Sequence, residues 1–187
     1  AMSSRTDTSR GWTVALGATL LVAAALRALR LDAGLWYDEL VTLVLSARLP
    51  LGTIVTTFPG VNQHPLYSVL AHVSMAVFGE SAWTLRLPAA VFGVASVAAT
   101  WTLGRRLLTH AEAWAAALLL ATSYHHIWFS QNARGYTLLA FLTLAFTQAL
   151  RAALRSASPR ALGAWVALGV IGVYTHLTMA FVVVGQA

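Results

Sequence analysis

Two carboxylates stand side by side near the start of the chain, in the run Trp36-Tyr37-Asp38-Glu39. Aromatic neighbours at a membrane surface remove water from a carboxylate, and a poorly hydrated carboxylate is suited to act as a general base. A structural role explains the same residues, because Asp38 could cap the helix that follows and Glu39 would be a favourable acid in its first turn. The spacing leaves both roles open, and one residue can serve both.

Basic side chains occur at two places that would suit a phosphate. His64, in the run Asn62-Gln63-His64-Pro65, precedes a proline that favours the first position of a helix, where free backbone N–H groups bind anions. Arg134 lies between Gln131 and Tyr136 near membrane level, where a guanidinium is costly unless an anion neutralises it. The alternatives are a polar loop end for His64, and an internal ion pair or a lipid headgroup for Arg134.

The other histidines indicate a metal site less well. His125 and His126 are adjacent, so their side chains diverge by about 100° on a helix and make a poor ligand pair. A divalent metal bound with Asp38 or His64 stays open, whereas the absence of Cys excludes a thiolate site and a disulfide framework. His176 suits a polar contact between helices as well as a site.

The elements that must position these residues are membrane helices. The chain of 187 residues is 58% hydrophobic and 10% charged, with a mean hydropathy of +0.70, which is too apolar for a soluble domain. Several stretches reach the roughly 20 apolar residues that cross a bilayer core about 30 Å thick. They are Ala- and Leu-rich without alternation of period two, so we predict an all-α integral membrane bundle rather than a barrel.

The apolar stretches divide the chain into spans and one long loop. We expect spans at about residues 12–29, 82–104, 113–128, 135–150 and 161–175, and the start of a further span at 177–187. Residues 30–81 form an external loop with interfacial helices over 38–48 and 65–79. As a helix, the 65–79 stretch covers roughly 22 Å, which is too short for a full crossing.

The charges orient this arrangement in the membrane. All 12 basic residues are Arg, and they lie at the ends of apolar stretches rather than in a basic patch, so we expect no nucleic-acid binding. If residues 65–79 stay at the surface, the arginine clusters at 105–106 and 151–160 face the cytoplasm, as the positive-inside rule requires. The polar segments described above then lie on the external face. The Ala- and Arg-rich, Lys-free composition is typical of a GC-rich bacterial genome and favours a bacterial inner membrane.

Six short motifs occur in a fixed order over nearly the whole chain. They are Leu35-Trp36-Tyr37-Asp38-Glu39, Gln63-His64-Pro65-Leu66-Tyr67, Leu85-Arg86-Leu87-Pro88-Ala89, Gly104-Arg105-Arg106-Leu107, Trp128-Phe129-Ser130-Gln131-Asn132-Ala133-Arg134-Gly135-Tyr136 and Tyr174-Thr175-His176. In this order they resemble the GT-C glycosyltransferases, in the branch with the protein O-mannosyltransferases and the lipid A aminoarabinose transferases. The resemblance implies a GT-C helical bundle and an inverting transfer of a sugar from a polyprenyl-phosphate carrier to an acceptor on the outer face.

The resemblance also implies roles for four residues. Asp38 matches the base toward the acceptor hydroxyl, with Glu39 as its acidic neighbour, so both are expected in the catalytic machinery. His64 and Arg134 match positions near the donor phosphate, where positive charge would stabilise the departing group. The partners would be a polyprenyl-phosphate-linked sugar, an acceptor that is a lipid, a glycan or a protein, and membrane lipids. No cofactor is assigned, and a divalent metal stays open.

Five further side chains are candidates for the substrate groove, namely Tyr37, Gln63, Gln131, Tyr136 and His176. Because members of this family are longer, we expect the chain to be a fragment. The alternative function is a non-catalytic membrane module, such as a transporter fragment or a scaffold subunit, in which the charges only cap and orient helices. A transporter would place its ionisable residues nearer the middle of the membrane.

Overall fold

The structure is a computed structural model that describes residues 2–58, 60 and 63–187. Within these residues all regular secondary structure is helical, which confirms the all-α prediction. In chain order the elements are α1 (Met2–Ala28), α2 (Tyr37–Thr42), the π-helix η1 (Leu43–Ala47), α3 (Leu51–Thr56), α4 (Pro65–Phe78), α5 (Ala82–Gly104), α6 (His110–Thr122), α7 (Tyr124–Ser130), α8 (Tyr136–Ser156), α9 (Pro159–Thr175) and α10 (Met179–Gln186).

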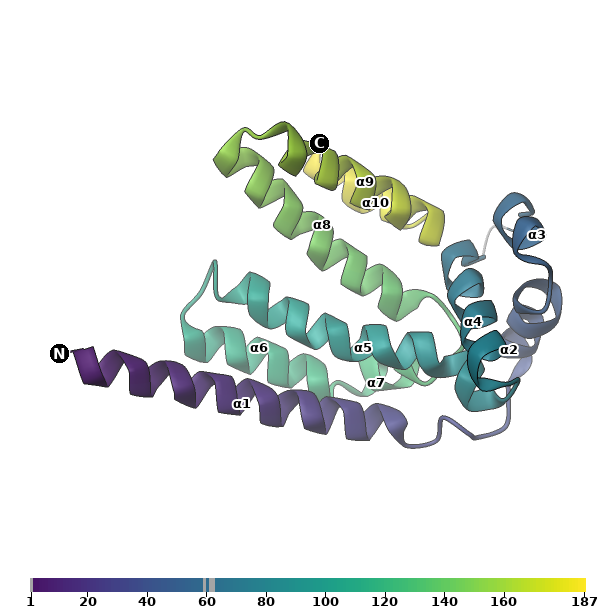
Figure 1. Ribbon diagram of the computed structural model, residues 1–187, viewed down its shortest axis with the longest axis horizontal. Helices are drawn as coiled ribbons and strands as arrows, with labels where there is room; N and C mark the ends of the chain where they lie inside the picture. Colours follow the sequence, from purple (N-terminus) through teal and green to yellow (C-terminus); the bar gives the residue numbers. More distant parts are fainter. Residues whose placement is uncertain (1, 59, 61–62) are drawn as a thin grey trace.

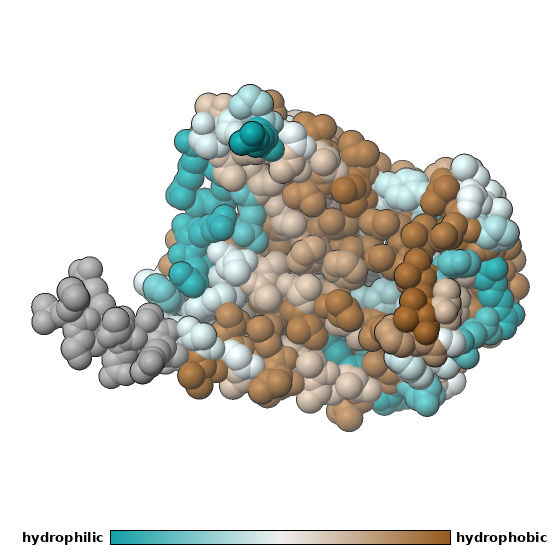
Figure 2. All heavy atoms as spheres, viewed as in Figure 1, coloured by the Kyte–Doolittle hydropathy of each residue, from teal (hydrophilic) through white to brown (hydrophobic). Residues whose placement is uncertain are grey.

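The long helices form a membrane bundle. Among the described residues, three helices are long and apolar enough to cross a bilayer, namely Gly11–Ala28 within α1, Ala82–Gly104 and Tyr136–Ser156. Figure 1 shows the long helices running roughly along the long axis, while α2, α3 and α4 gather at one end. Figure 2 shows a broad hydrophobic zone over the middle of the bundle and hydrophilic residues toward both ends. This distribution suits a lipid solvent, and the protein is a multi-pass membrane protein.

The helix expected over residues 113–128 is instead broken into α6 and α7. Ser123 has an extended backbone between them, with ψ of 121°, and its hydroxyl accepts a hydrogen bond from the backbone N–H of His126 at 3.5 Å. Serine favours this N-cap position because its side chain satisfies a backbone donor that the helix leaves free. Hydropathy averaged over a long window passes over the break, because the apolar residues of α6 and the run Ile127-Trp128-Phe129 outweigh the few polar residues between them.

Two other helix ends have local causes. Gly79 ends α4 with φ of +85°, a backbone conformation that side-chain-bearing residues rarely adopt. His176 follows α9 with an extended backbone, and the chain then reverses so that α10 packs against α8 and α9. This break lies at the interruption expected around Tyr174 to His176.

Pro88 lies inside α5 and makes that helix depend on its neighbour. Proline has no N–H, so the carbonyl four residues earlier, that of Thr84, lacks its helical partner. The Ser74 hydroxyl of α4 donates to this carbonyl at 2.7 Å, and the Tyr67 hydroxyl donates to the adjacent carbonyl of Leu85 at 2.7 Å. Helix α4 is thereby tied to the end of α5 that leads to the site.

Small side chains let the remaining helices approach closely. Ala23 of α1 packs with Ala113 and Ala117 of α6 beside α5. A Cβ atom on Gly104 of α5 would lie only 2.9 Å from the Cβ of Ala113. A second cluster joins η1, α4 and α5 around the fully buried Tyr67. The two clusters hold the two ends of α5.

The segment expected as one helix over 38–48 consists of α2 followed by η1. In the wider π-turn, the backbone N–H of Arg48 donates to the carbonyl of Leu43 at 3.0 Å. The Ala47 carbonyl forms a hydrogen bond with Nδ1 of His72 on α4 at 2.9 Å. The outer side of this segment exposes apolar side chains such as Leu40 and Val44.

Candidate active site

Four side chains from three separate segments meet at one end of the bundle. His64 precedes α4, Arg134 and Tyr136 lie at the start of α8, and His176 follows α9. The His64 ring stacks on His176 with centroids 4.6 Å apart and meets Tyr136 edge-on at 4.8 Å. The guanidinium carbon of Arg134 lies 5.9 Å from the centre of the Tyr136 ring. We call His64, Arg134, Tyr136 and His176 the basic cluster.

Three members of the basic cluster are buried although they are polar, and Tyr136 is half-buried. The exposed fraction is 4% for His64, 5% for Arg134 and 9% for His176. Among the described residues, neither ring nitrogen of His64 and not Nε2 of His176 has a hydrogen-bond partner. A buried polar atom that lacks a partner costs about 1–3 kcal/mol. These nitrogen atoms therefore suit a ligand that supplies the missing hydrogen bonds.

Gly135 provides the space in which His64 packs against the start of α8. A Cβ atom at this position would lie 2.8 Å from Nδ1 of His64 and 3.1 Å from its Cβ. Since the φ of Gly135 is −78°, an ordinary value, space rather than backbone conformation requires glycine here.

The environment keeps His64 neutral. Burial, followed by repulsion from the Arg134 guanidinium and from His176 when that ring is protonated, lowers the pKa of His64 from its ordinary value of 6.5 to about 3. A charged imidazole would lose its hydration here and would lie beside a guanidinium. His64 therefore meets a ligand as a neutral ring, and the fixed positive charge of the basic cluster is that of Arg134.

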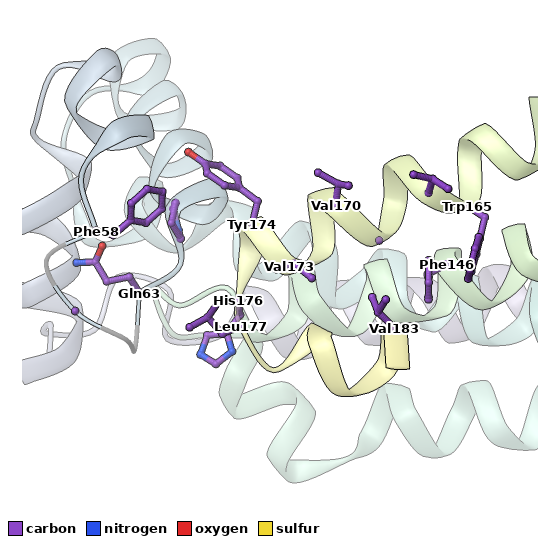
Figure 3. Close-up of a pocket in the computed structure, with 14 residues that line it drawn as sticks. Phe58, Gln63, Phe146, Trp165, Val170, Val173, Tyr174, His176, Leu177 and Val183 are labelled. Carbon is purple, nitrogen blue, oxygen red and sulfur yellow. The ribbon is translucent and has the colours of Figure 1, made fainter. Parts of the chain in front are cut away.

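An apolar cavity of about 860 Å³ adjoins the basic cluster. Figure 3 shows Gln63 and His176 at one end of the cavity, and Phe146 and Trp165 at the other. Aliphatic and aromatic side chains, many of them from α9, make most of its wall. The cavity thus joins a polar end to a long apolar space, as a ligand with a polar head and an apolar chain would require.

Asp38 lies in the first turn of α2 but does not cap it. The N-cap is Trp36, so Asp38 is the second helical residue, and the capping role expected for it is wrong. Its side chain is half-buried, and within the described part of the chain its carboxylate makes no hydrogen bond or ion pair. The carboxylate is therefore available to a substrate.

Glu39, expected beside Asp38 in the catalytic machinery, has the opposite environment. Its side chain is fully buried, and Arg86 of α5 donates to both carboxylate oxygens, at 2.7 and 2.5 Å. The backbone N–H of Ala133 donates to Oε1 at 2.7 Å, and that of Trp36 donates to Oε2 at 3.2 Å. Four donors therefore occupy the two carboxylate oxygens, an arrangement typical of a structural ion pair.

This ion pair also positions the turn that carries Arg134. Ala133, whose N–H binds Glu39, directly precedes Arg134, so the first turn of α2 and the start of α8 are held together. Gln131 donates through its side-chain amide to the carbonyls of Leu26 and Leu29, at 2.8 and 2.5 Å. Gln131 therefore satisfies the end of α1, and its expected place in the substrate groove is not supported by this geometry.

The other groove candidates separate by location. Tyr136 belongs to the basic cluster, and Gln63 and His176 line the cavity. Tyr37 is 76% exposed on α2, and it does not line the cavity. Asn62, named with His64 in the sequence motif, lies outside the described residues.

Two arginines near helix ends are buried, namely Arg27 in the last turn of α1 and Arg86 near the start of α5. Arg86 donates to Glu39 and also to the carbonyls of Leu31 and Ala33, at 2.8 and 2.6 Å, so it holds the first loop to α5. Arg27 of α1 is fully buried and donates to the carbonyl of Ala121 at 3.1 Å, at the end of α6. The available signal was their position inside apolar stretches, where a guanidinium needs dedicated acceptors.

The structure offers little for a metal. Among the described residues, no group of three His, Asp or Glu side chains gathers as metal ligands. His126 instead lies with Nδ1 2.7 Å from Nη2 of Arg27, so its ring accepts a hydrogen bond from the guanidinium.

Comparison with known proteins adds one match. Residues 62–186 match the model of a family described as dolichyl-phosphate-mannose-protein mannosyltransferase. The matched region contains all of the basic cluster and every helix from α4 to α10, while α2 with Asp38 precedes it. No curated protein and no solved structure gives a significant match.

Proposed function

Because the chain belongs to the dolichyl-phosphate-mannose-protein mannosyltransferase family, whose model covers residues 62–186, we propose that it is an inverting glycosyltransferase. It moves a sugar from a polyprenyl-phosphate donor to an acceptor hydroxyl on the external face of the membrane. Membership confirms the GT-C resemblance and a mannosyltransferase-like function that depends on a polyprenyl-phosphate sugar. The residues, the acceptor and the membrane face belong to the proposal.

The basic cluster beside the apolar cavity is the observation that carries this proposal. A polyprenyl-phosphate sugar has an anionic phosphate joined to a long apolar chain. Arg134 offers a planar guanidinium that can bind two phosphate oxygens, and the buried histidine nitrogens offer further contacts. The adjoining cavity of about 860 Å³ can take the part of the isoprenoid chain nearest the phosphate.

The proposed chemistry uses Asp38 and Arg134 in separate roles. The acceptor hydroxyl oxygen forms a bond to the anomeric carbon while the bond from that carbon to the phosphate oxygen breaks. The hydroxyl proton passes to the Asp38 carboxylate, and the electron pair leaves with the polyprenyl phosphate, whose charge Arg134 stabilises. Attack opposite the phosphate inverts the anomeric centre. The contact between Glu39 and Ala133 supports this pairing, because it holds the segments of Asp38 and Arg134 together.

We place the protein in a bacterial inner membrane with the basic cluster on the external side. The Ala- and Arg-rich, Lys-free composition supports a bacterial source, and the arginines after α5 and α8 support a cytoplasmic position for those ends. The acceptor on that side is a lipid, a glycan or a protein.

Substitution of Arg134 tests the proposed donor site. The full chain, reconstituted in liposomes, is assayed for transfer from polyprenyl-phosphate mannose. We expect Arg134→Ala to lower the rate of sugar transfer by about a hundredfold or more. Arg134→Lys should lower it by about tenfold, because lysine keeps the positive charge but cannot donate two parallel hydrogen bonds to the phosphate. Arg48→Ala is the matched control, because Arg48 lies in the external loop, half-exposed and paired with Glu80. A rate of transfer in Arg134→Ala equal to that of the parent would contradict the phosphate role of Arg134. No sugar transfer by the parent chain itself would instead favour the alternative of a non-catalytic membrane module.

A further inference from the structure

We propose that His176 is a neutral hydrogen-bond donor to the phosphate of the isoprenoid carrier and marks the boundary between its phosphate and its chain. The inference rests on the proposed function, because it names a further binding residue of that site. It is carried by the hydrogen bonds of the His176 ring, by the burial of its free nitrogen and by its place in the cavity.

The hydrogen bonds of His176 determine which of its nitrogens carries the proton. The backbone N–H of Thr178 lies 3.2 Å from Nδ1 of His176, and the Thr178 hydroxyl oxygen lies 2.8 Å from the same atom. A backbone N–H can only donate, so Nδ1 is an acceptor. In a neutral imidazole the proton then resides on Nε2, which becomes a donor.

The Nε2 donor is buried without a partner. His176 is 9% exposed, and Nε2 has no hydrogen-bond partner among the described residues. A half-turn of the imidazole ring would replace Nδ1 by a carbon atom, and both hydrogen bonds with Thr178 would be lost. These hydrogen bonds therefore fix the direction in which Nε2 points. A ligand oxygen would satisfy a donor that is otherwise costly to bury.

The location of His176 identifies the oxygen. The ring stacks on His64 within the basic cluster. It also lines the apolar cavity (Figure 3). A ligand whose phosphate binds at Arg134 and whose chain enters the cavity must pass His176 where the phosphate meets the chain. The oxygen that reaches Nε2 is therefore a phosphate oxygen. An isoprenoid alcohol without the phosphate lacks this charged acceptor and should not depend on Nε2.

Two isosteric substitutions separate this role from a structural one. Asparagine reproduces the Nδ1 side of the ring and can keep the contact with Thr178, whereas glutamine places an amide N–H near the position of Nε2. We expect His176→Asn to weaken binding of farnesyl phosphate to the full chain about tenfold, and His176→Gln to stay within about threefold of the parent. Binding of farnesol, the uncharged control, should be the same in both variants. The matched control is His125→Asn, because His125 is exposed.

The transfer assay and a spectroscopic measurement complete the test. The asparagine variant should raise the KM for the polyprenyl-phosphate sugar more than it lowers kcat, and farnesyl phosphate should shift the ¹⁵Nε2–H resonance of His176 in the parent. Equal binding by the two variants, whether retained or lost, or an unchanged resonance, would overturn the inference while Arg134-dependent transfer upheld the proposed function. Selective binding without any sugar transfer would uphold the inference and sink the proposed function.

Discussion

Adjacent carboxylates with opposite surroundings are the main finding at the scale of single residues. Glu39 is buried among four donors, whereas the half-buried Asp38 carboxylate has no partner within the described residues. A base must accept a proton from a substrate, so its oxygens cannot already be occupied. This difference supports the proposal that Asp38 is the base, while Glu39 forms the buried ion pair with Arg86.

Asp38→Asn tests the base directly. Asparagine keeps the size of the side chain but cannot accept the proton, so we expect transfer to fall by at least about a hundredfold. The thermal unfolding midpoint should stay within the error of the parent, because Asp38 neither caps α2 nor forms an ion pair. Near-normal transfer by this variant would remove Asp38 from the chemistry.

The lowered pKa of His64 predicts a dependence of stability on pH. Between pH 6.5 and about 3 the unfolded chain binds a proton at His64 that the folded chain does not bind. The contribution of neutral His64 to stability is therefore complete above pH 6.5 and is lost as the pH falls toward 3. At one pKa unit per 1.36 kcal/mol, the loss at pH 5 is about 2 kcal/mol.

Equilibrium unfolding in detergent at pH 7 and pH 5 measures this loss. We expect His64→Gln to show a smaller difference between the two pH values than the parent, and the exposed His125→Gln to behave like the parent. The same pH dependence in the His64 variant as in the parent would show that His64 titrates normally in the folded chain.

At the scale of elements, the Glu39–Arg86 pair joins α2, α5 and the turn before α8. Arg86 also holds the carbonyls of Leu31 and Ala33, and Glu39 binds the N–H of Ala133. The two residues thus connect the segment of the proposed base with the segment of Arg134. The site is assembled from separate helices, and the buried Glu39–Arg86 pair fixes the positions of these helices relative to one another.

Removal of one partner of this pair should destabilise the protein strongly. Glu39→Gln leaves the buried Arg86 without a counter-charge, so we expect a loss of about 3–5 kcal/mol in the free energy of unfolding. Replacement of both Glu39 and Arg86 by leucine should lower the free energy of unfolding by less than Glu39→Gln does, because no buried charge is then left unpaired. Glu80→Gln is the control, because the Arg48–Glu80 pair is half-exposed, and it should leave the unfolding midpoint unchanged. An equally mild effect of both glutamine variants would remove Glu39 from the scaffold role.

At the scale of the whole molecule, the helices divide the polar residues between two ends of an apolar bundle. Figure 1 shows the α2–α4 segment at the end opposite the loop between α5 and α6. The arginines after α5 and α8 lie away from the basic cluster along the lengths of these helices. From the positive-inside rule we therefore expect the site and these arginines on opposite sides of the membrane.

Cysteine labelling tests this topology without background, because the chain has no native Cys. We choose two single-cysteine variants, Thr57→Cys and Leu107→Cys. Thr57 lies in the segment after α3, Leu107 lies in the loop after α5, and both residues are exposed. In intact cells we expect a membrane-impermeant maleimide to label position 57 and to label position 107 only after permeabilisation. Equal labelling of both positions from one side would overturn the topology and the external site.

The sequence by itself determined the class of fold and the members of the basic cluster. Hydropathy sums over consecutive residues, so apolar stretches near α1, α5, α8 and α9 were readable, and helix-start and turn signals singled out His64, Arg134 and His176. Spacing alone could not separate Asp38 from Glu39, because both have the same local pattern, and only the family resemblance singled out Asp38 as the base. The break at Ser123 was hidden for another reason, since a hydropathy average over a whole span conceals a few polar residues between two apolar runs.

The tertiary structure alone decided the partners of the polar groups. Arg86 and Ala133 lie 47 and 94 residues from Glu39 in the chain, and Gln131 lies 105 residues from Leu26. The cavity is likewise formed by α9 with residues from the first loop. A hydrogen bond or an ion pair depends on a few tenths of an ångström between such distant residues, and neither periodicity nor composition specifies that distance.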